Sequence, residues 1–180
     1  AQFNLALLHQ FGLGTPPDPD KAIVWYRRAA DGGNPFARFN LGQVYLFGTG
    51  VAIDHAMAAK WFRLAADQGH ATAQLNLGFL HFVGRGVARD IPTALSWYRR
   101  AAQQGEPDAQ LNLANLLYSG APDIAADEAD DDDASDGTTG TPATTQSGVT
   151  IDHDAAASWY RRAAESGHPE AQLTLGALYL

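Results

Sequence analysis

The sequence predicts an all-α solenoid, a single-file stack of helix pairs. Its 180 residues contain a repeat, because Trp25, Trp61 and Trp97 lie 36 residues apart. The alanines that open an apolar motif keep the same spacing, at Ala1, Ala37, Ala73 and Ala109. Both halves of each repeat carry apolar residues at helical spacing. One helix pair cannot bury its apolar face alone, so the repeat predicts stacked pairs that share a continuous core.

The first half of each repeat predicts a helix, which we call helix A. With the repeat alanine counted as position 1, apolar or small residues recur at positions 1, 5, 8 and 9, which form one face of a helix. The motif reads A-Q-F-N-L-A-L-L-H from Ala1 and A-Q-L-N-L-G-F-L-H from Ala73. Glycine suits a chain that leaves helical geometry at positive φ, and it ends most of these helices. The terminating glycines are Gly12, Gly48, Gly84 and Gly120.

The second half predicts helix B, which an aspartate opens. Each aspartate is placed to accept a hydrogen bond from an orphan N–H group of the first turn. These residues are Asp18, Asp54, Asp90 and Asp152. Glycines predict the C-terminal caps, at Gly33, Gly69, Gly105 and Gly167. Proline two residues beyond three of them predicts the start of the next helix A, at Pro35, Pro107 and Pro169.

Arginine pairs follow the tryptophan of three helices B, at Arg27-Arg28, Arg99-Arg100 and Arg161-Arg162. Paired arginines are one way to bind phosphate. These pairs, however, lie on the polar side of the helix near Asp31 and Glu165, in the C-terminal half that favours cations. The pattern favours a solvated, salt-bridged face.

Four units and the beginning of a fifth follow from the repeat. We place them at 1–36, 37–72, 73–108, 109–170 and 171–180. The fourth unit holds 26 extra residues, after which Ile151-Asp152-His153 restores the register of Ile53-Asp54-His55. Residues 121–147 include eight acids, no Lys or Arg and little apolar area, so we expect a disordered acidic insertion. Weak contact of this loop with basic proteins or cations is the alternative to a solubilising linker.

Charge and composition exclude several classes of protein. The net charge of -8 comes from the acidic insertion, since the other residues balance 12 bases against 12 acids. A body without a basic stripe lacks the electrostatic footprint of nucleic-acid binding. The chain has no cysteine, which excludes disulfides and thiolate metal sites. No apolar run approaches the roughly 20 residues that span a bilayer. We expect a soluble excerpt of a longer protein, of unknown localisation.

We predict no catalytic, cofactor or metal site. The elements Gly48-Thr49-Gly50 and Gly84-Arg85-Gly86 follow helices and lack the third glycine of a dinucleotide fingerprint, so they predict turns. The histidines have no second ligand at i+3 or i+4 to complete a zinc pair. The serines lie in no nucleophile-elbow motif. We therefore expect a protein that is not an enzyme.

These motifs resemble the Sel1-like repeat family, relatives of the tetratricopeptide repeat. The shared elements are A-x-x-x-L-G-x-x-Y-x-x-G-x-G-V-x-x-D and A-x-x-W-Y-R-R-A-A-x-x-G, and they cover nearly the whole chain outside the insertion. The fourth unit departs from them, with Ala114 in place of the small glycine. The resemblance implies a right-handed α/α superhelical solenoid that serves as a scaffold or adaptor for protein or peptide partners. It also implies one of two locations for the protein, a complex of the endoplasmic reticulum or the bacterial envelope.

The predicted binding surface is a second face of helix A. Where repeats differ on a face they share, packing does not dictate the residue, and position 7 varies most. Positions 3, 7 and 10 form an i, i+4, i+7 stripe, and the resemblance implies that this stripe lines the concave groove of the solenoid. Such grooves bind helices or extended segments. The predicted groove residues are Phe39, Gln43, Leu46, Leu75, Phe79, Phe82, Asn115 and Tyr118.

Two alternatives stay open. In the first, positions 3 and 10 pack between neighbouring units, and only position 7 is exposed. In the second, the whole stripe packs against further repeats or a neighbouring domain, and the chain is a structural spacer of a longer protein.

Overall fold

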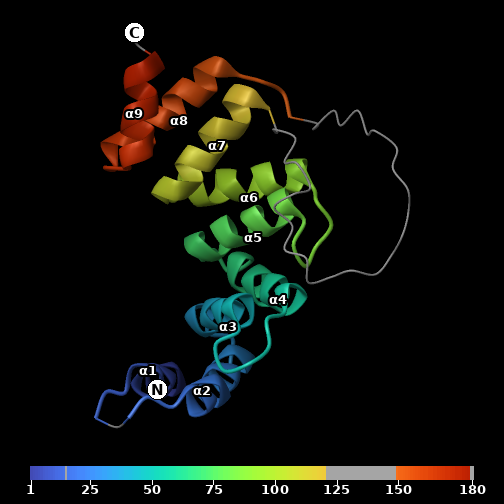
Figure 1. The fold of residues 1–180 in the computed structure, drawn as a ribbon, viewed down its shortest axis with the longest axis vertical. Coiled ribbons are helices and arrows are strands. Elements are labelled where there is room, and N and C mark those ends of the chain that lie inside the picture. Colours follow the sequence, from blue (N-terminus) through green and yellow to red (C-terminus); the bar gives the residue numbers. More distant parts are fainter. Residues whose placement is uncertain (15, 121–148, 179–180) are drawn as a thin grey trace.

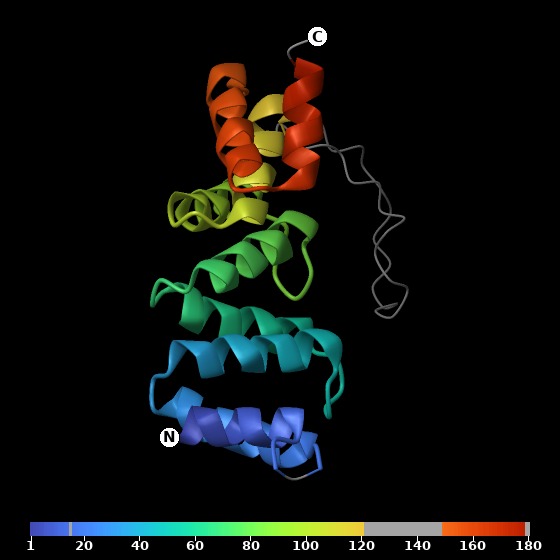
Figure 2. The ribbon, with the colours of Figure 1, turned by 90° about the vertical axis from the view of Figure 1, so that its left-hand side faces the viewer.

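The computed structural model describes residues 1–14, 16–120 and 149–178, and in these ranges the protein is all helix and turn. Its helices are α1 (Gln2–Phe11), α2 (Pro19–Asp31), α3 (Pro35–Phe47), α4 (His55–Ala66), α5 (Ala71–Val83), α6 (Ile91–Gln103), α7 (Pro107–Ser119), α8 (His153–Glu165) and α9 (Pro169–Leu178). The main packing contacts join helices that are consecutive in the chain. The pairs therefore rise in single file from α1 to α9, as Figures 1 and 2 show. The predicted all-α solenoid is confirmed.

The aspartates cap the helices B as predicted. The carboxylate of Asp54 accepts a hydrogen bond from the backbone N–H of Met57 at 2.8 Å, and Asp152 accepts one from Ala155 at 2.9 Å. Asp18 and Asp90 make the same bond in α2 and α6. Each capping residue also donates its own N–H to the carbonyl at position 9 of the preceding helix A. This backbone bond fixes where helix B starts against helix A.

The same backbone bond forms in the unit that holds the insertion. Asp152 N–H donates to the carbonyl of Leu117 at 2.8 Å, just as Asp54 donates to Tyr45 at 2.9 Å. The 26 extra residues therefore leave the register of the helix pair unchanged, as the sequence predicts. The path out of α7 does differ, because Gly120 has φ 70° and ψ -168° whereas Gly48 is in the left-handed helical conformation. The predicted disorder of 121–147 lies outside the described residues.

A side chain at position 2 of helix A ties each repeat to the one before it. Gln74 donates its amide N–H to the carbonyl of Ala66 at 3.0 Å, across the joint between α4 and α5. The other three joints repeat this bond, from Arg38 to Ala30, from Gln110 to Ala102 and from Gln172 to Ala164. The accepting carbonyls belong to the last turn of helix B, and each also accepts the backbone N–H of the glycine three residues later, as Ala66 does from Gly69 at 2.9 Å. The side-chain bond is therefore a second bond to that acceptor, and it sets the entry of the next helix.

The second arginine of each pair contacts the tryptophan of its own helix, a contact that the sequence analysis did not predict. The guanidinium of Arg28 lies over the ring of Trp25, 4.7 Å from its centroid, and does not pair with Asp31 among the described residues. Arg100 and Arg162 lie in the same way over Trp97 and Trp159. The other arginine of the first pair, Arg27, donates to the hydroxyl of Tyr45 at 2.7 Å, across the joint. The tryptophans thus hold the second arginine of each pair by a cation–π contact.

Glycine at position 6 lets helix A approach helix B closely. A Cβ atom added at Gly78 would lie 2.8 Å from ring carbons of Tyr98, and one added at Gly42 would meet the ring of Phe62. In the fourth unit Ala114 occupies this position, fully buried. In α9, Gly176 occupies repeat position 6, and no atom lies within 4 Å of a Cβ added there. A glycine-to-alanine substitution can therefore be compared at a crowded position, Gly78, and at an open one, Gly176.

We expect Gly78→Ala to lower the free energy of unfolding by about 1–3 kcal/mol, because the methyl group overpacks the contact with Tyr98. Gly176→Ala is the matched control, and it should leave stability unchanged or raise it by up to about 1 kcal/mol through helix propensity. Urea denaturation followed by circular dichroism measures both. Equal effects of the two substitutions would show that the contact between Gly78 and Tyr98 does not limit the approach of the helices.

Candidate partner-binding recess

An open recess of about 330 Å³ lies between α5, α7 and the start of α9. Its apolar lining comes from Leu75 and Phe79 of α5 and from Leu111 of α7. Leu75 and Leu111 are themselves buried in the core, whereas the side chain of Phe79 is 44% exposed. The recess thus has a fixed apolar floor, and Phe79 presents a solvated aromatic surface above it.

Two asparagines place free amide groups in this recess. Asn76 and Asn112 line it from α5 and α7, and they occupy position 4 of successive repeats. Neither side chain forms a hydrogen bond with another described residue, and both are partly exposed. A carboxamide offers two donors and an acceptor. The recess therefore holds two unused polar groups, one repeat apart.

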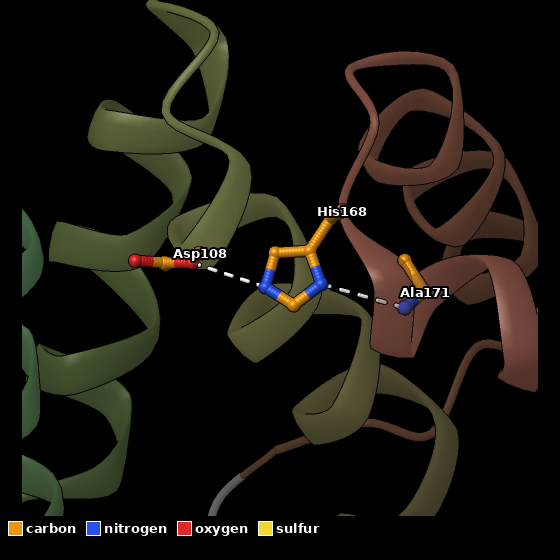
Figure 3. Close-up of polar contacts among 3 residues, drawn as sticks. All are labelled: Asp108, His168 and Ala171. Atoms are coloured by element: carbon orange, nitrogen blue, oxygen red, sulfur yellow. Dashed lines mark hydrogen bonds and ion pairs between the residues drawn. The ribbon is translucent and has the colours of Figure 1, made fainter.

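A contact across the joint closes one side of the recess (Figure 3). Nε2 of His168 lies 3.0 Å from a carboxylate oxygen of Asp108, and Nδ1 of the same ring lies 3.5 Å from the backbone nitrogen of Ala171. Nδ1 faces an N–H group, so it acts as the acceptor and Nε2 carries the proton that it donates to Asp108. Glu170 completes the lining on α9. The ring nitrogens of His168 are thus both engaged.

The structure brings some predicted groove residues to this recess and places others elsewhere. Leu75 and Phe79 line it. Phe39 stacks on His70 at 4.6 Å, and Leu46 packs on the same core cluster as Phe39. Gln43 is partly exposed on α3, and Phe82 packs against the core beside α7.

Asn115 and Tyr118 of α7 face the helix that follows in the chain. The hydroxyl of Tyr160 donates to Oδ1 of Asn115 at 2.6 Å. The ring of Tyr118 lies 5.0 Å from that of His153 and 6.3 Å from that of Tyr160, although 42% of Tyr118 is exposed. The amide of Asn115 is thus partly used within the fold, unlike the amides of Asn76 and Asn112.

Leu111 belongs to the predicted stripe as its position 3, but it was not among the predicted groove residues. The other five residues of the recess lie outside the stripe, namely Asn76, Asp108, Asn112, His168 and Glu170. A signal for two of them was present. Asparagine recurs at position 4 in the first four units, as Asn4, Asn40, Asn76 and Asn112. A comparison that looks only for variation between repeats discards such a position as structural. The side chains of Asn76 and Asn112 nevertheless have no hydrogen-bond partner among the described residues.

Comparison with known proteins identifies the family. The Sel1 repeat profile matches residues 1–34, 35–70, 71–106, 107–129 and 145–168. The chain belongs to the Sel1 repeat family. Three of these matches begin two residues before a repeat alanine, at the residues where α3, α5 and α7 begin.

Solved structures of this family share the fold. The chain is similar to c5321, described as a protective antigen present in uropathogenic Escherichia coli strains displaying an SLR fold, with 31% identity and a TM-score of 0.81. It is also similar to a Sel1 repeat protein from Oxalobacter formigenes, with 33% identity and a TM-score of 0.81. Each comparison covers 99% of this chain, but only 33% and 63% of the two relatives.

A more distant likeness shows the fold alone. Helicobacter pylori cysteine rich protein B is 22% identical, with a TM-score of 0.52 over 60% of this chain and 85% of that one. No curated protein matches the sequence.

Family membership supports a coarse statement of function. Sel1 repeat proteins are commonly scaffolds for protein interactions, and their solenoid is typically non-catalytic. In the described ranges, none of the helices has both the length and the hydrophobicity needed to cross a bilayer. Those ranges likewise contain no group of three His, Asp or Glu side chains arranged to hold a metal ion.

The joints of this Sel1 repeat chain differ in the residue that caps helix A. At equivalent places lie Asn34, His70, Glu106 and His168. Oδ1 of Asn34 accepts a hydrogen bond from Ala37 N–H at 2.8 Å, and Nδ1 of His70 accepts one from Ala73 N–H at 3.2 Å. Burial lowers the pKa of His70 from its ordinary 6.5. A protonated Nδ1 cannot accept the bond, so the cap at α5 depends on neutral His70.

We expect the protein to lose stability as the pH falls below about 6.5, partly through His70. The pKa of His70 is lower in the folded state than in the unfolded state, so the unfolded chain binds the proton first and acid favours unfolding. His70→Asn keeps a capping oxygen, as Asn34 does, and removes this titration. Urea titrations between pH 5 and 7.5 should therefore show a shallower pH dependence for the variant than for the wild type. Identical slopes would contradict a capping role for neutral His70.

Proposed function

We propose that this chain is a non-catalytic module that binds an extended protein segment in the recess between α5, α7 and the start of α9. The free amides of Asn76 and Asn112 carry this proposal. Each can donate to a backbone carbonyl and accept from a backbone N–H of a bound strand. The two amides lie at equivalent places in successive repeats. They therefore suit an extended peptide, whose backbone N–H and C=O groups also recur at regular intervals.

The apolar floor supplies the second element of binding. Leu75 and Leu111 are fixed by the core, so they lose no freedom when a ligand covers them. Phe79 is exposed, and covering its ring would remove apolar area from water. Aromatic side chains in such settings often dominate binding energy. Phe79 is therefore the expected anchor, with the asparagines giving orientation.

The lining does not favour catalysis. It contains no Ser, Thr, Cys or Lys side chain that could act as a nucleophile. The imidazole of His168 is a poor candidate for a general base, because its unprotonated nitrogen faces the backbone N–H of Ala171. The amides and the apolar floor of the recess suit binding of a segment, and they have no part in nucleophilic catalysis.

We expect Phe79→Ala to weaken segment binding by about 1–3 kcal/mol and to leave thermal unfolding nearly unchanged. The probe is a peptide selected on this chain from a library of random dodecapeptides, and titration calorimetry measures its affinity. Phe47→Ala is the matched control, because Phe47 is 66% exposed on α3 and does not line the recess. A fall in melting temperature with unchanged affinity would assign Phe79 to packing.

We expect the double variant Asn76→Ala/Asn112→Ala to weaken the same peptide roughly tenfold or more, at about 1 kcal/mol for each lost bond. Its melting temperature should stay close to that of the wild type, since no described residue bonds to these amides. Gln103→Ala, an exposed amide on α6, is the control. If every selected peptide ignored Phe79 and both asparagines, this face would instead be a packing surface for another part of a longer protein.

A further inference from the structure

One repeat position changes its chemistry along the stack. The residue just before the repeat alanine is Phe36 in α3, Thr72 in α5, Asp108 in α7 and Glu170 in α9. Phe36 is 56% exposed, and its ring lies 6.1 Å from that of Phe3 and 5.2 Å from that of His70. The same position is thus aromatic near α1 and α3 and acidic near α7 and α9. Packing requires neither character, because both occur at one place in the repeat.

No basic side chain of the helices A neutralises the acidic end. Within the described helices α1, α3, α5, α7 and α9, Arg38 is the one Lys or Arg. Its guanidinium is engaged with the carbonyls of Ala30 at 3.1 Å and Leu64 at 3.4 Å, one repeat away from the recess. His168 touches Asp108, and the carboxylate of Glu170 forms no hydrogen bond or ion pair with another described residue. The recess therefore presents an excess of negative charge beside an apolar floor.

We infer that the recess accepts a lysine or arginine side chain of the bound segment. This inference rests on the proposed function and adds the chemistry of the partner. The cationic head is met by the carboxylates of Asp108 and Glu170, and its aliphatic stem covers Phe79 and the leucine floor. Asn76 and Asn112 hold the backbone on either side of that residue.

Other occupants fit the recess less well. An acidic segment would be repelled by both carboxylates. A purely apolar segment would leave Asp108 and Glu170 partly desolvated without a counter-charge. A metal ion is disfavoured, because the described residues offer no group of three ligands arranged to hold one. Charge complementarity thus selects a lysine or arginine, whose aliphatic stem can cover the apolar floor.

The test uses the whole chain and acetylated, amidated peptide mixtures that are random except for one central residue. That residue is Lys, Arg, Leu or Glu in four separate mixtures. We expect the Lys and Arg mixtures to bind most strongly, and Asp108→Asn/Glu170→Gln to weaken them roughly five- to tenfold. Both substitutions are isosteric, and the amide oxygen that Asp108→Asn introduces still accepts the bond from His168.

The control is Asp67→Asn/Glu165→Gln, which removes the same charge from exposed acids outside the recess. It should change the affinity of the basic mixtures little. Equal weakening by both double variants would overturn the inference, because the preference would then reflect net charge alone. Melting temperatures of all variants verify that the fold is kept.

The remaining outcomes separate this inference from the proposed function. If the Leu mixture bound best and lost affinity on Asn76→Ala/Asn112→Ala but not on Asp108→Asn/Glu170→Gln, the groove would stand and the basic residue would be wrong. If no mixture lost affinity on either double substitution, Asn76→Ala/Asn112→Ala or Asp108→Asn/Glu170→Gln, both proposals would be wrong. Weakening of the basic mixtures in high salt, absent for the Leu mixture, would support the inference.

Discussion

The hydrogen bond from position 2 of helix A to the last turn of the preceding helix B sets the geometry of this protein. It occurs at all four joints, with donor–acceptor distances of 3.0–3.2 Å. At the joint to α7 it is buried, so losing the acceptor would leave the amide donor of Gln110 without a partner inside the protein. One joint uses arginine and three use glutamine, which shows that the bond, and not the residue type, is the constraint. Because it recurs, successive helices A present their first turns to the same side, and the recess forms there.

Most of the fold follows from local chemistry that the sequence displays. The capping aspartates, the helix-ending glycines and the alanine pairs act within one repeat or between neighbours, and neighbours are all that a solenoid requires. This is why removing 26 residues from the count restores the register, and why Asp152 bonds to Leu117 as Asp54 bonds to Tyr45. The arginine pairs were harder to predict, since a cation over a tryptophan at i+3 and an ion pair at similar spacing leave the same pattern in the sequence.

The candidate site was only partly predictable, because spacing gives the faces of a helix but not its rotation against its partner. Position 10 follows position 6 by four residues, so it lies on the side where Gly78 touches Tyr98. This explains why Tyr118 meets Tyr160 across the pair. Position 11 follows position 7 in the same way, and Phe11 and Phe47 at that position are more than 60% exposed. Positions 4, 7 and 11 thus form a more open stripe, although Asn115 at position 7 also accepts a bond from Tyr160. Position 4 brings in the asparagines.

The repeats divide their residues between stacking and recognition at the first turn of helix A. Position 2 is committed to the joint and position 3 to the core, as Gln110 and Leu111 show in α7. The asparagine at position 4 forms no side-chain hydrogen bond with a described residue. The residue before position 1 makes contacts that differ from joint to joint, because Phe36 packs on His70, Thr72 donates to Glu106 and Asp108 accepts from His168. The residue before position 1 can therefore change from Phe36 to Glu170 while the bond from position 2 stays the same. The recess needs three successive helices A, because α5 and α7 supply its floor and α9 supplies His168 and Glu170. Recognition is therefore a property of consecutive repeats, and no single helix pair of this chain contains it.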